Sequence, residues 1–481
     1  MLGVVGRATS ATRFWRKARL TRIERGPGAH RARFARGRIW GAAILSWACA
    51  TPIHAGQSGF GLGLSLAHES NIFRVEANPQ SEWIRALMFG LFYQENTIDL
   101  TAHVLAQVER RHFYRQTFSD DTGGFLDGAA VWTILPRRLT WAVDDVFREV
   151  QLNIADPTTP SNLTKSNSLN TGPDFTFPLS STNSAVIGGR YGRFDIQNSV
   201  NDTRRYTAYG RGLHALSPQT KVSLNYEASR VYFEPGAQVI SKILREDWFA
   251  RYENLSAANS MTIDVGTSRV TQYGGTALEG NRLVRLALSE ALSSRSTVRM
   301  GLADQISDTY SDLIAGVTRS TAPSDTGVAA FSGTTLASGD LYRSKRGDFA
   351  YTNNDGRLQY TLQVYGRRVD FETLDQDYQE RGGTFSWIWA YTGAMQFNAS
   401  ARYMKRTFSP VDPASPLSGR QDADRIYGAG VTYRLNSNVT VTMEGGHTKH
   451  QSTVLLSSFV DNRAMLLLGY SSGPYEVRPR R

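Results

Sequence analysis

Apolar and polar residues alternate one by one along much of the chain after residue 55. In the segment Val222–Ser229, apolar residues occupy every second position with polar residues between them, and the segments 261–266, 358–365 and 439–444 repeat this pattern. A period of two places apolar side chains on one face of a strand and polar side chains on the other. The pattern therefore predicts amphipathic β-strands.

The length of these stretches distinguishes two all-β architectures that share the alternation. Strands of a soluble sandwich or propeller are mostly about five or six residues long, whereas a tilted strand that crosses a bilayer needs about 9 to 11 residues. The alternating stretches here extend to about ten residues, and no segment after residue 55 reaches the roughly 18 consecutive apolar residues of a membrane helix. We therefore expect a transmembrane β-barrel with its apolar face towards lipid and its polar face towards the lumen.

Short turns recur along the chain, and each is followed by a new alternating stretch. Six of them begin with leucine, three more lie around single residues, and longer polar stretches separate them. The six are Leu135–Arg138, Leu179–Thr182, Leu216–Gln219, Leu255–Ala258, Leu292–Arg295 and Leu435–Asn438, the three lie around Glu95, Asn354 and Gly393, and the polar stretches are Asn153–Gly172, Ser311–Asp340 and Ser409–Asp424. The series predicts an antiparallel barrel of about 20 strands, in a range of about 16 to 22, with short periplasmic turns and longer outer loops.

The end of the chain departs from this regular pattern. Leu466, Leu468 and Tyr470 predict a last strand that ends on an aromatic residue, but the chain continues through Gly473 to a basic tail that ends at Arg481. The sequence therefore leaves open where the final strand closes.

The first 55 residues differ in composition from the rest. They hold ten arginines and one lysine against a single acid, Glu24, so that the net charge of +11 falls to +1 for the remainder. This asymmetry removes the support for a nucleic-acid partner. The basic segment precedes a short apolar run, Ile39–Ala50, and then Thr51–Ala55, in which the small Ala55 suits the position before signal-peptidase cleavage. A secretory signal peptide has this order of parts, and we expect residues 1–55 to be cleaved near Ala55, with a cut after Ala50 as the alternative.

The only cysteine, Cys49, lies within this leader, so the mature protein is expected to contain no thiol. No phosphate-binding glycine loop, zinc-protease motif or serine nucleophile elbow occurs. The histidines at 447 and 450 fall on opposite faces of an extended segment. We expect no cofactor, no metal site and no enzymatic activity, with an outer-membrane hydrolase as the remaining enzyme alternative.

Charged residues on the predicted polar faces are the candidate functional residues. They are Glu227, Asp264, Arg285, Arg367, Arg402 and Glu444. Both signs are present, as in a water-filled lumen that selects solutes by its local field. The alternative, in which these charges pair across the barrel and simply fill it, stays open at this point.

Three segments carry a resemblance to a known group of proteins. They are Glu69–Arg74, which contains Asn71; Trp141–Phe147, which contains Asp144 and Asp145; and Pro160–Asn162, which leads to Asn170–Pro173 with Gly172. The segments, and the region from about Gly56 to Arg193, resemble outer-membrane barrel proteins that occur with exopolysaccharide and exosortase (PEP-CTERM) gene clusters. One departure is Glu69-Ser70, where an aspartate is expected directly before the asparagine. The physical interpretation of Asp144 and Asp145 is a strand end beside a loop.

The resemblance implies a role in making or exporting a surface polysaccharide, with the polysaccharide and export-machinery proteins as partners beside outer-membrane lipid. From the sequence we expect residues 56–481 to form one barrel in the outer membrane of a Gram-negative bacterium. Its expected function is that of a porin-like conduit or accessory component of export. A structural or adhesive barrel without transport is the main alternative.

Overall fold

A computed structural model gives the structure of the chain after the leader. It describes residues 56–197, 202–233, 242–256, 258–272, 277–320, 336, 340–372, 374–473 and 476–478. The predicted signal peptide, residues 1–55, lies outside the described residues, and so does its cysteine.

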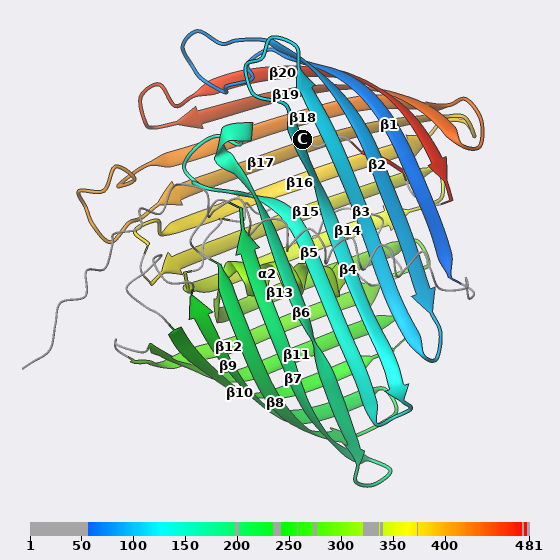
Figure 1. Cartoon of the computed structure of the whole chain (residues 1–481), viewed down its shortest axis with the longest axis vertical. Helices are drawn as coiled ribbons and strands as arrows, with labels where there is room; N and C mark the ends of the chain where they lie inside the picture. The colour runs from blue at the N-terminus through cyan, green and yellow to red at the C-terminus, as the bar shows by residue number, and fades with distance from the viewer. Residues whose placement is uncertain are drawn as a thin grey trace, which may run out of the picture. The chain divides into compact units, whose positions relative to one another are not determined.

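Twenty β-strands make up almost all of this structure (Figure 1). Their bounds are β1 (Gln57–Glu69), β2 (Glu82–Asn96), β3 (Leu100–Phe113), β4 (Asp121–Leu135), β5 (Leu139–Gln151), β6 (Leu163–Pro178), β7 (Asn183–Ile196), β8 (Thr203–Ala215), β9 (Thr220–Phe233), β10 (Lys242–Leu255), β11 (Asn259–Gln272), β12 (Ala277–Ala291), β13 (Ser296–Ser307), β14 (Tyr342–Asn354), β15 (Leu358–Phe371), β16 (Tyr378–Ala390), β17 (Met395–Phe408), β18 (Gln421–Arg434), β19 (Val439–Ser452) and β20 (Phe459–Ser472). A short 3-10 helix, η1 (Pro160–Asn162), follows β5, and helix α2 (Thr309–Ser320) follows β13.

Each strand pairs antiparallel with the next one in sequence, and the last strand returns to the first. β1 pairs with β2 from Gln57↔Gln94 to Glu69↔Glu82, and with β20 from Phe60↔Ser472 to Glu69↔Arg463. The sheet is thus closed and has no free edge, as a barrel in a bilayer requires. The prediction of an antiparallel barrel of about 20 strands is confirmed.

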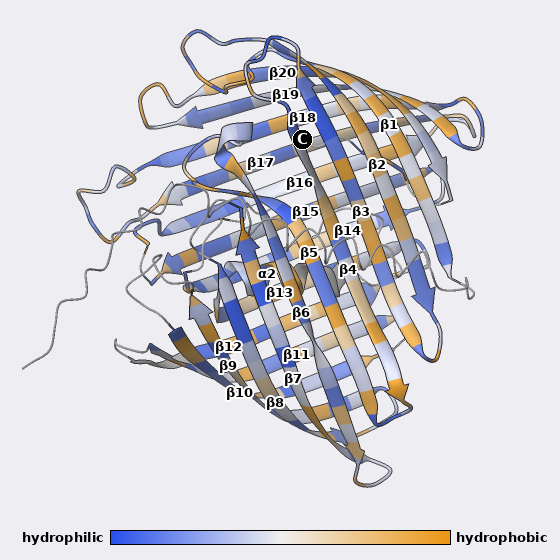
Figure 2. Ribbon diagram, viewed as in Figure 1, coloured by the Kyte–Doolittle hydropathy of each residue, from blue (hydrophilic) through white to orange (hydrophobic). Residues whose placement is uncertain are grey.

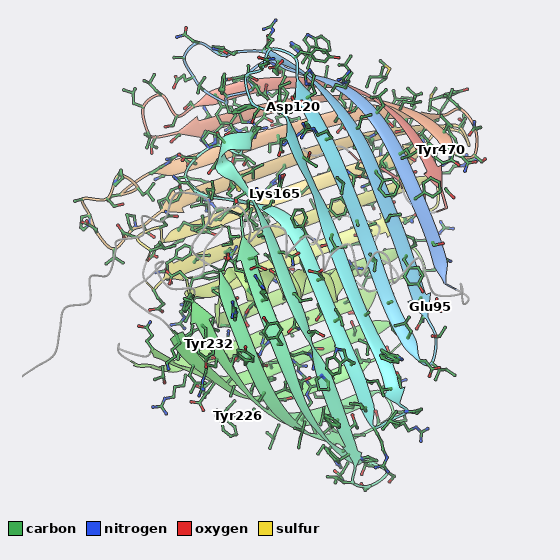
Figure 3. The ribbon with its side chains drawn as sticks, in the orientation of Figure 1. Glu95, Asp120, Lys165, Tyr226, Tyr232 and Tyr470 are labelled. Atoms are coloured by element: carbon green, nitrogen blue, oxygen red, sulfur yellow. The ribbon has the colours of Figure 1, made fainter. Side chains whose placement is uncertain are left out.

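The two rims differ in the length of their connections, as predicted. All nine short turns lie between strands on one rim, from the turn after β2 to the turn Leu435–Asn438 after β18. The other rim carries the longer connections, of which residues 308–341 between β13 and β14 form the longest. In Figure 3, Glu95 and Tyr470 lie towards the rim with the short turns, and Asp120 and Lys165 towards the rim with the loops.

Two of the predicted loops are shorter than their polar sequences suggest. The stretch Asn153–Gly172 was expected to be loop throughout, but β6 begins at Leu163. Thr164, Ser166 and Ser168 are buried at alternate positions of β6, so polar residues here mark an inward strand face instead of a loop. Similarly, Ser409–Asp424 is a loop only up to residue 420, because β18 begins at Gln421.

The outer face of the barrel is apolar. Leu362 and Val364 of β15 are both exposed, at 45% and 47% of their residue surface, although both are hydrophobic. Alternating apolar and polar residues along the strands make this pattern visible in Figure 2. A closed barrel with an apolar exterior and a polar interior is the architecture of outer-membrane proteins, in which lipid covers the exposed apolar band. The protein is therefore an outer-membrane β-barrel.

Within the part of the chain that the structure describes, no helix has the length and apolar character needed to cross a membrane.

The buried apolar residues lie inside the barrel. They form five clusters. Three of these join inward-facing strand residues with the loop after β5, with Val477 of the C-terminal tail and with α2. One cluster places Tyr310 and Leu313 of α2 against Val146 of β5 and Phe194 of β7, and Figure 1 shows α2 within the ring of strands. The core is therefore the contact between the wall and what fills the lumen.

Candidate functional site: the lumen

Charged side chains form a row along the inner wall that Ala303 interrupts on β13. Residues that face each other directly on adjacent antiparallel strands point to the same side of the sheet, so the strand register defines this row. From β10 to β18 it contains Arg251, Asp264, Arg285, Ala303, Arg346, Arg367, Glu380, Arg406 and Asp422, which we call the inward charged row. Five arginines against three acids make the row basic.

Ion pairs connect the first members of the row. Asp264 is only 2% exposed, and its carboxylate accepts hydrogen bonds from Nε of Arg251 at 2.6 Å and from Nη2 of the same residue at 2.9 Å. Nε of Arg285 lies 3.2 Å from the same carboxylate. Arg285 also lies over the ring of Phe249, at 5.0 Å from its centroid. The structure thus brings together two predicted residues, Asp264 and Arg285, with Arg251, which was not predicted.

Two further arginines of the row hold the elements that fill the lumen. Nη2 of Arg367 donates to Oδ2 of Asp312 in α2 at 3.0 Å, and the hydroxyl of Tyr342 donates to the same oxygen at 2.7 Å. Arg406 pairs with Glu380 at 2.5 Å and also donates from Nη1 to the carbonyl oxygen of Ile154 at 2.8 Å. The row therefore lines the lumen with charge and also binds α2 and the loop after β5.

The remaining predicted residues lie on the same face but outside the row. Glu227 is opposite Asp247 of β10, and Arg402 is opposite Thr384 of β16. Glu444 is opposite Met465, which is buried in the interior against the C-terminal tail. Together with Asp264, Arg285 and Arg367, they make up the six charged residues predicted from the sequence, and these six do not converge on one point. Their predicted role in selecting solutes stays a prediction.

The loop between β5 and β6, residues 152–162, reaches the opposite wall. Ile154 and Ala155 pack with Tyr342, Tyr378 and Phe408 of β14, β16 and β17. These strands lie about halfway around the ring from β5 and β6. The carbonyl of Ala155 also accepts a hydrogen bond of 2.5 Å from Arg420. A loop bound to both walls crosses the lumen and narrows it.

Asn162 gives this loop its shape. Its amide nitrogen donates to the carbonyl oxygens of Asn153, Asp156 and Pro157 at 2.8 to 3.1 Å, and its Oδ1 accepts from the backbone nitrogen of Asn153 at 2.9 Å. One buried side chain therefore satisfies four backbone groups that the irregular loop would otherwise leave without partners. Asn162 belongs to one of the three segments that resemble exopolysaccharide-associated barrels, and its contacts give it a structural role.

The segment after β13 also contacts both sides of the lumen. Asp308, just before α2, forms a buried ion pair with Arg205 of β8, and Arg205 lies 4.6 Å from the ring centroid of Tyr310. Burial by itself raises the pKa of the Asp308 carboxyl, but the Arg205 guanidinium and hydrogen bonds from Ser311 outweigh it and hold this pKa below its ordinary value. Asp308 is therefore charged at neutral pH, and it fixes the start of α2 to the wall on that side.

The C-terminal tail turns back into the barrel after β20. Val477 is 6% exposed and packs against Ala67, Met88 and Leu467 of the inner wall. Gln107 of β3 binds the backbone of Arg478 twice, by accepting from its nitrogen at 3.0 Å and donating to its carbonyl at 2.5 Å. The last strand thus ends at Ser472, and residues 476–478 of the tail that follows lie in the lumen against the inner wall of β1 to β3.

Other residues of the three resembling segments also make contacts that stabilise the fold. Asn71 bonds Val75 and the backbone of Val460, and so ties the first outer loop to β20. The indole of Trp141 donates to Thr171 at 2.8 Å across β5 and β6. A Cβ at Gly172 would meet the carbonyl oxygen of Gly189 at 2.0 Å, and the carbonyl of Pro173 accepts a hydrogen bond from Arg190 at 3.2 Å.

The interpretation of Asp144 and Asp145 as a strand end was wrong. Both lie in the middle of β5, on opposite faces of it. Asp144 faces inwards and accepts a hydrogen bond from Asn170 at 3.1 Å. The error arose because two adjacent acids in a sequence look solvated, whereas the neighbouring strand supplies a partner that sequence spacing does not show.

Sequence analysis missed the segments that fill the lumen. Weak signals were present: Ile154 and Ala155 are apolar residues within a polar stretch, Tyr310 and Leu313 are three residues apart, and Val477 stands in a basic tail. Each of these residues is buried. Among the described residues, no three histidine, cysteine, aspartate or glutamate side chains are grouped as a metal site would need.

Comparisons with known proteins identify solved structures of similar fold, but they do not identify a family. No family model matches the chain, and no curated protein matches it. Similar solved structures include a variant of the ferric enterobactin receptor PfeA from Pseudomonas aeruginosa in complex with enterobactin, with 12% identity over 88% of this chain and 82% of that one and a TM-score of 0.45. OpdO from Pseudomonas aeruginosa has 11% identity over 87% and 98% with a TM-score of 0.35. The FrpB iron transporter from Neisseria meningitidis has 10% identity over 86% and 81% with a TM-score of 0.45. These likenesses are distant, and no property of those proteins is carried over to this chain.

Proposed function

We propose that the protein is a porin-like conduit of the outer membrane in which a basic inner wall and inward-folded segments select what passes. The observation that carries this proposal is the inward charged row, because two of its arginines hold the narrowing elements and the others line the wall. Charged groups in a confined aqueous path change the local concentration of ions and solutes. Five arginines against three acids in the row favour anionic solutes.

The finer proposal is that the solute belongs to surface polysaccharide export. Its support is the resemblance of three segments to barrels that accompany exopolysaccharide gene clusters. Guanidinium groups such as those of the inward charged row carry several donors each, and such donors suit the carboxylates and hydroxyls of sugars. An acidic polysaccharide would match the basic row.

Single-channel recording in planar bilayers tests the conduit. Reversing Arg285 and Arg402 to Glu is expected to move ion selectivity towards cations without loss of the barrel. Arg367 is left unchanged in this variant because it holds α2 through Asp312, so that its reversal would change the filling of the lumen as well as its charge. Reversal of two exposed turn arginines, Arg137 and Arg357, is the matched control and should have a smaller effect.

A second experiment tests the polysaccharide step in cells. Deletion of the gene should lower the amount of polysaccharide on the surface, and the wild-type chain should restore it. A folded protein that never conducts, together with unchanged polysaccharide after deletion, would remove the conduit and leave a structural or adhesive barrel.

A further inference from the structure

The outer face of the barrel carries a second basic row, near the rim with the long loops. It consists of Lys345, Arg368, Arg381, Lys405, Arg425 and Lys449 on β14 to β19, which we call the outward basic row. The exposed apolar residues Phe349, Val364, Phe385 and Tyr427 lie on the same outward faces, closer to the rim with the short turns. The row therefore lies just above the band that lipid tails cover.

The row consists of three directly opposed pairs of like charge. Lys345 faces Arg368, Arg381 faces Lys405, and Arg425 faces Lys449 across adjacent strands. Directly opposed residues have Cβ atoms about 5 Å apart, and like charges in these positions destabilise a sheet. An anion held between the two cations of a pair would offset this repulsion.

The anions that the protein supplies to this face lie at one end of the row: Asp304 of β13 is directly opposite Lys345 and pairs with Arg343 at 3.1 Å. Arg368 pairs with Asp370 at 2.8 Å. Within the described part of the chain, Lys345, Arg381, Lys405, Arg425 and Lys449 form no ion pair with an acid. Their long side chains can extend along the apolar surface and bring their charges to the level of lipid headgroups. Anions that offset Arg381, Lys405, Arg425 and Lys449 would therefore come from the surroundings of the barrel.

The surface beside the cations is hollowed. A hollow of about 910 Å³ lies beside four cations of the row. Its apolar lining includes Val284, Leu302, Gly347 and Gly366, and its polar lining includes Lys345, Arg368, Arg381, Lys405, Asp304, Gln379, Thr407, Ser409 and Gln421. Gly366 leaves open space, since a Cβ there would meet nothing within 4 Å, whereas the side chain of Leu302 lies against Gly347. A ligand that combines phosphate groups with acyl chains would fill both parts of this surface.

We propose that the outward basic row binds lipid A, the phosphorylated glycolipid of the outer leaflet, with its phosphates between the opposed cations and an acyl chain in the hollow. The position fits because the rim with the long loops is the outer rim of such barrels. The phosphates are strong acceptors, and arginine and lysine bind them through charge-assisted hydrogen bonds. This site is independent of whether the lumen conducts.

The test uses the mature barrel, refolded without lipid into dodecyl-maltoside micelles and titrated with bisphosphorylated lipid A by native mass spectrometry. Each cation near an anionic lipid surface contributes a factor of about five to binding, so Arg381→Gln with Lys405→Gln should weaken binding about 25-fold. Arg137→Gln with Arg357→Gln removes the same charge from the short turns and should leave binding unchanged. Exchange of the two cations, Arg381→Lys with Lys405→Arg, should preserve it.

Two further arms identify the source of the phosphate. Phosphatidylglycerol and inorganic phosphate should bind much more weakly than lipid A, because neither presents two phosphates on one rigid sugar unit. Equal binding of phosphatidylglycerol, or equal losses in the row variant and the turn control, would overturn the proposal.

Thermal unfolding provides a readout that a purely structural role would not give. Without lipid A, the Arg381→Gln, Lys405→Gln variant should melt at the same temperature as the wild type or higher, because it loses an opposed pair of like charges. With saturating lipid A, the order should reverse. A variant that is less stable under both conditions would show that these cations stabilise the barrel by themselves and would contradict the proposal.

Discussion

The loop between β5 and β6 provides the sharpest test of how the lumen is narrowed. Ile154 is 2% exposed and packs against Tyr378 and Phe408 on the opposite wall. Truncation of a buried isoleucine to alanine costs about 2 to 5 kcal/mol. Because Ile154 lies in a loop, we expect its truncation to weaken docking of the loop against the opposite wall, whereas the free energy of unfolding of the barrel should change little.

The size of the effect follows from this cost. A loss of about 2 kcal/mol lowers the ratio of docked to released loop about 30-fold, since every 1.4 kcal/mol is a factor of ten. The hydrogen bonds from Arg406 and Arg420 to the carbonyls of Ile154 and Ala155 remain possible in the variant. The Ile154→Ala protein should therefore release the loop intermittently, not permanently.

Single-channel recording measures this release. Ile154→Ala should show brief steps to a higher conductance and greater open-channel noise. A variant in which residues 153–158 are replaced by a short glycine-serine linker sets the conductance of the fully released state. Leu455→Ala is the control, because Leu455 is 87% exposed in another outer loop.

Two results would refute this reasoning in different ways. If the linker variant conducts like the wild type, the loop does not narrow the path. If the linker variant conducts more but Ile154→Ala is unchanged in conductance and noise, packing of Ile154 is not what holds the loop. Thermal unfolding of all variants checks that the barrel itself is intact.

Three other predictions concern the wall and the processing of the chain. Leu362→Arg places a charge on the lipid face, at a cost of about 2 to 4 kcal/mol near the midplane. It should therefore lower the folded yield, measured by heat-dependent gel mobility, more than the inward Gln363→Arg does. Equal yields of the two variants would contradict the assignment of faces. Gly172→Ala should destabilise the barrel, because its Cβ would lie 2.0 Å from a carbonyl oxygen, whereas Gly210→Ala meets nothing within 4 Å and should melt like the wild type. The mature protein should begin near Gly56 and fractionate with the outer membrane, as N-terminal sequencing of the extracted protein will show; recovery of the intact leader would disprove cleavage.

The sequence by itself determined the wall of this barrel. Alternation with a period of two reports which face of a strand is buried, and the short turns report where each strand reverses. Both signals are local, so Leu362 and Gln363 could be assigned to opposite faces from the sequence alone. The number of strands followed from the nine turns, because antiparallel neighbours in sequence are also neighbours in the sheet.

The tertiary structure alone decided what fills the lumen and which charges meet. Arg251, Asp264 and Arg285 lie on three strands, and only the register of β10, β11 and β12 places them side by side. The contacts of Ile154 with Phe408 and of Val477 with Met88 join residues that are hundreds of positions apart in the sequence. No periodicity records such pairs, because their burial depends on a closed ring of strands that brings distant segments into one enclosed space.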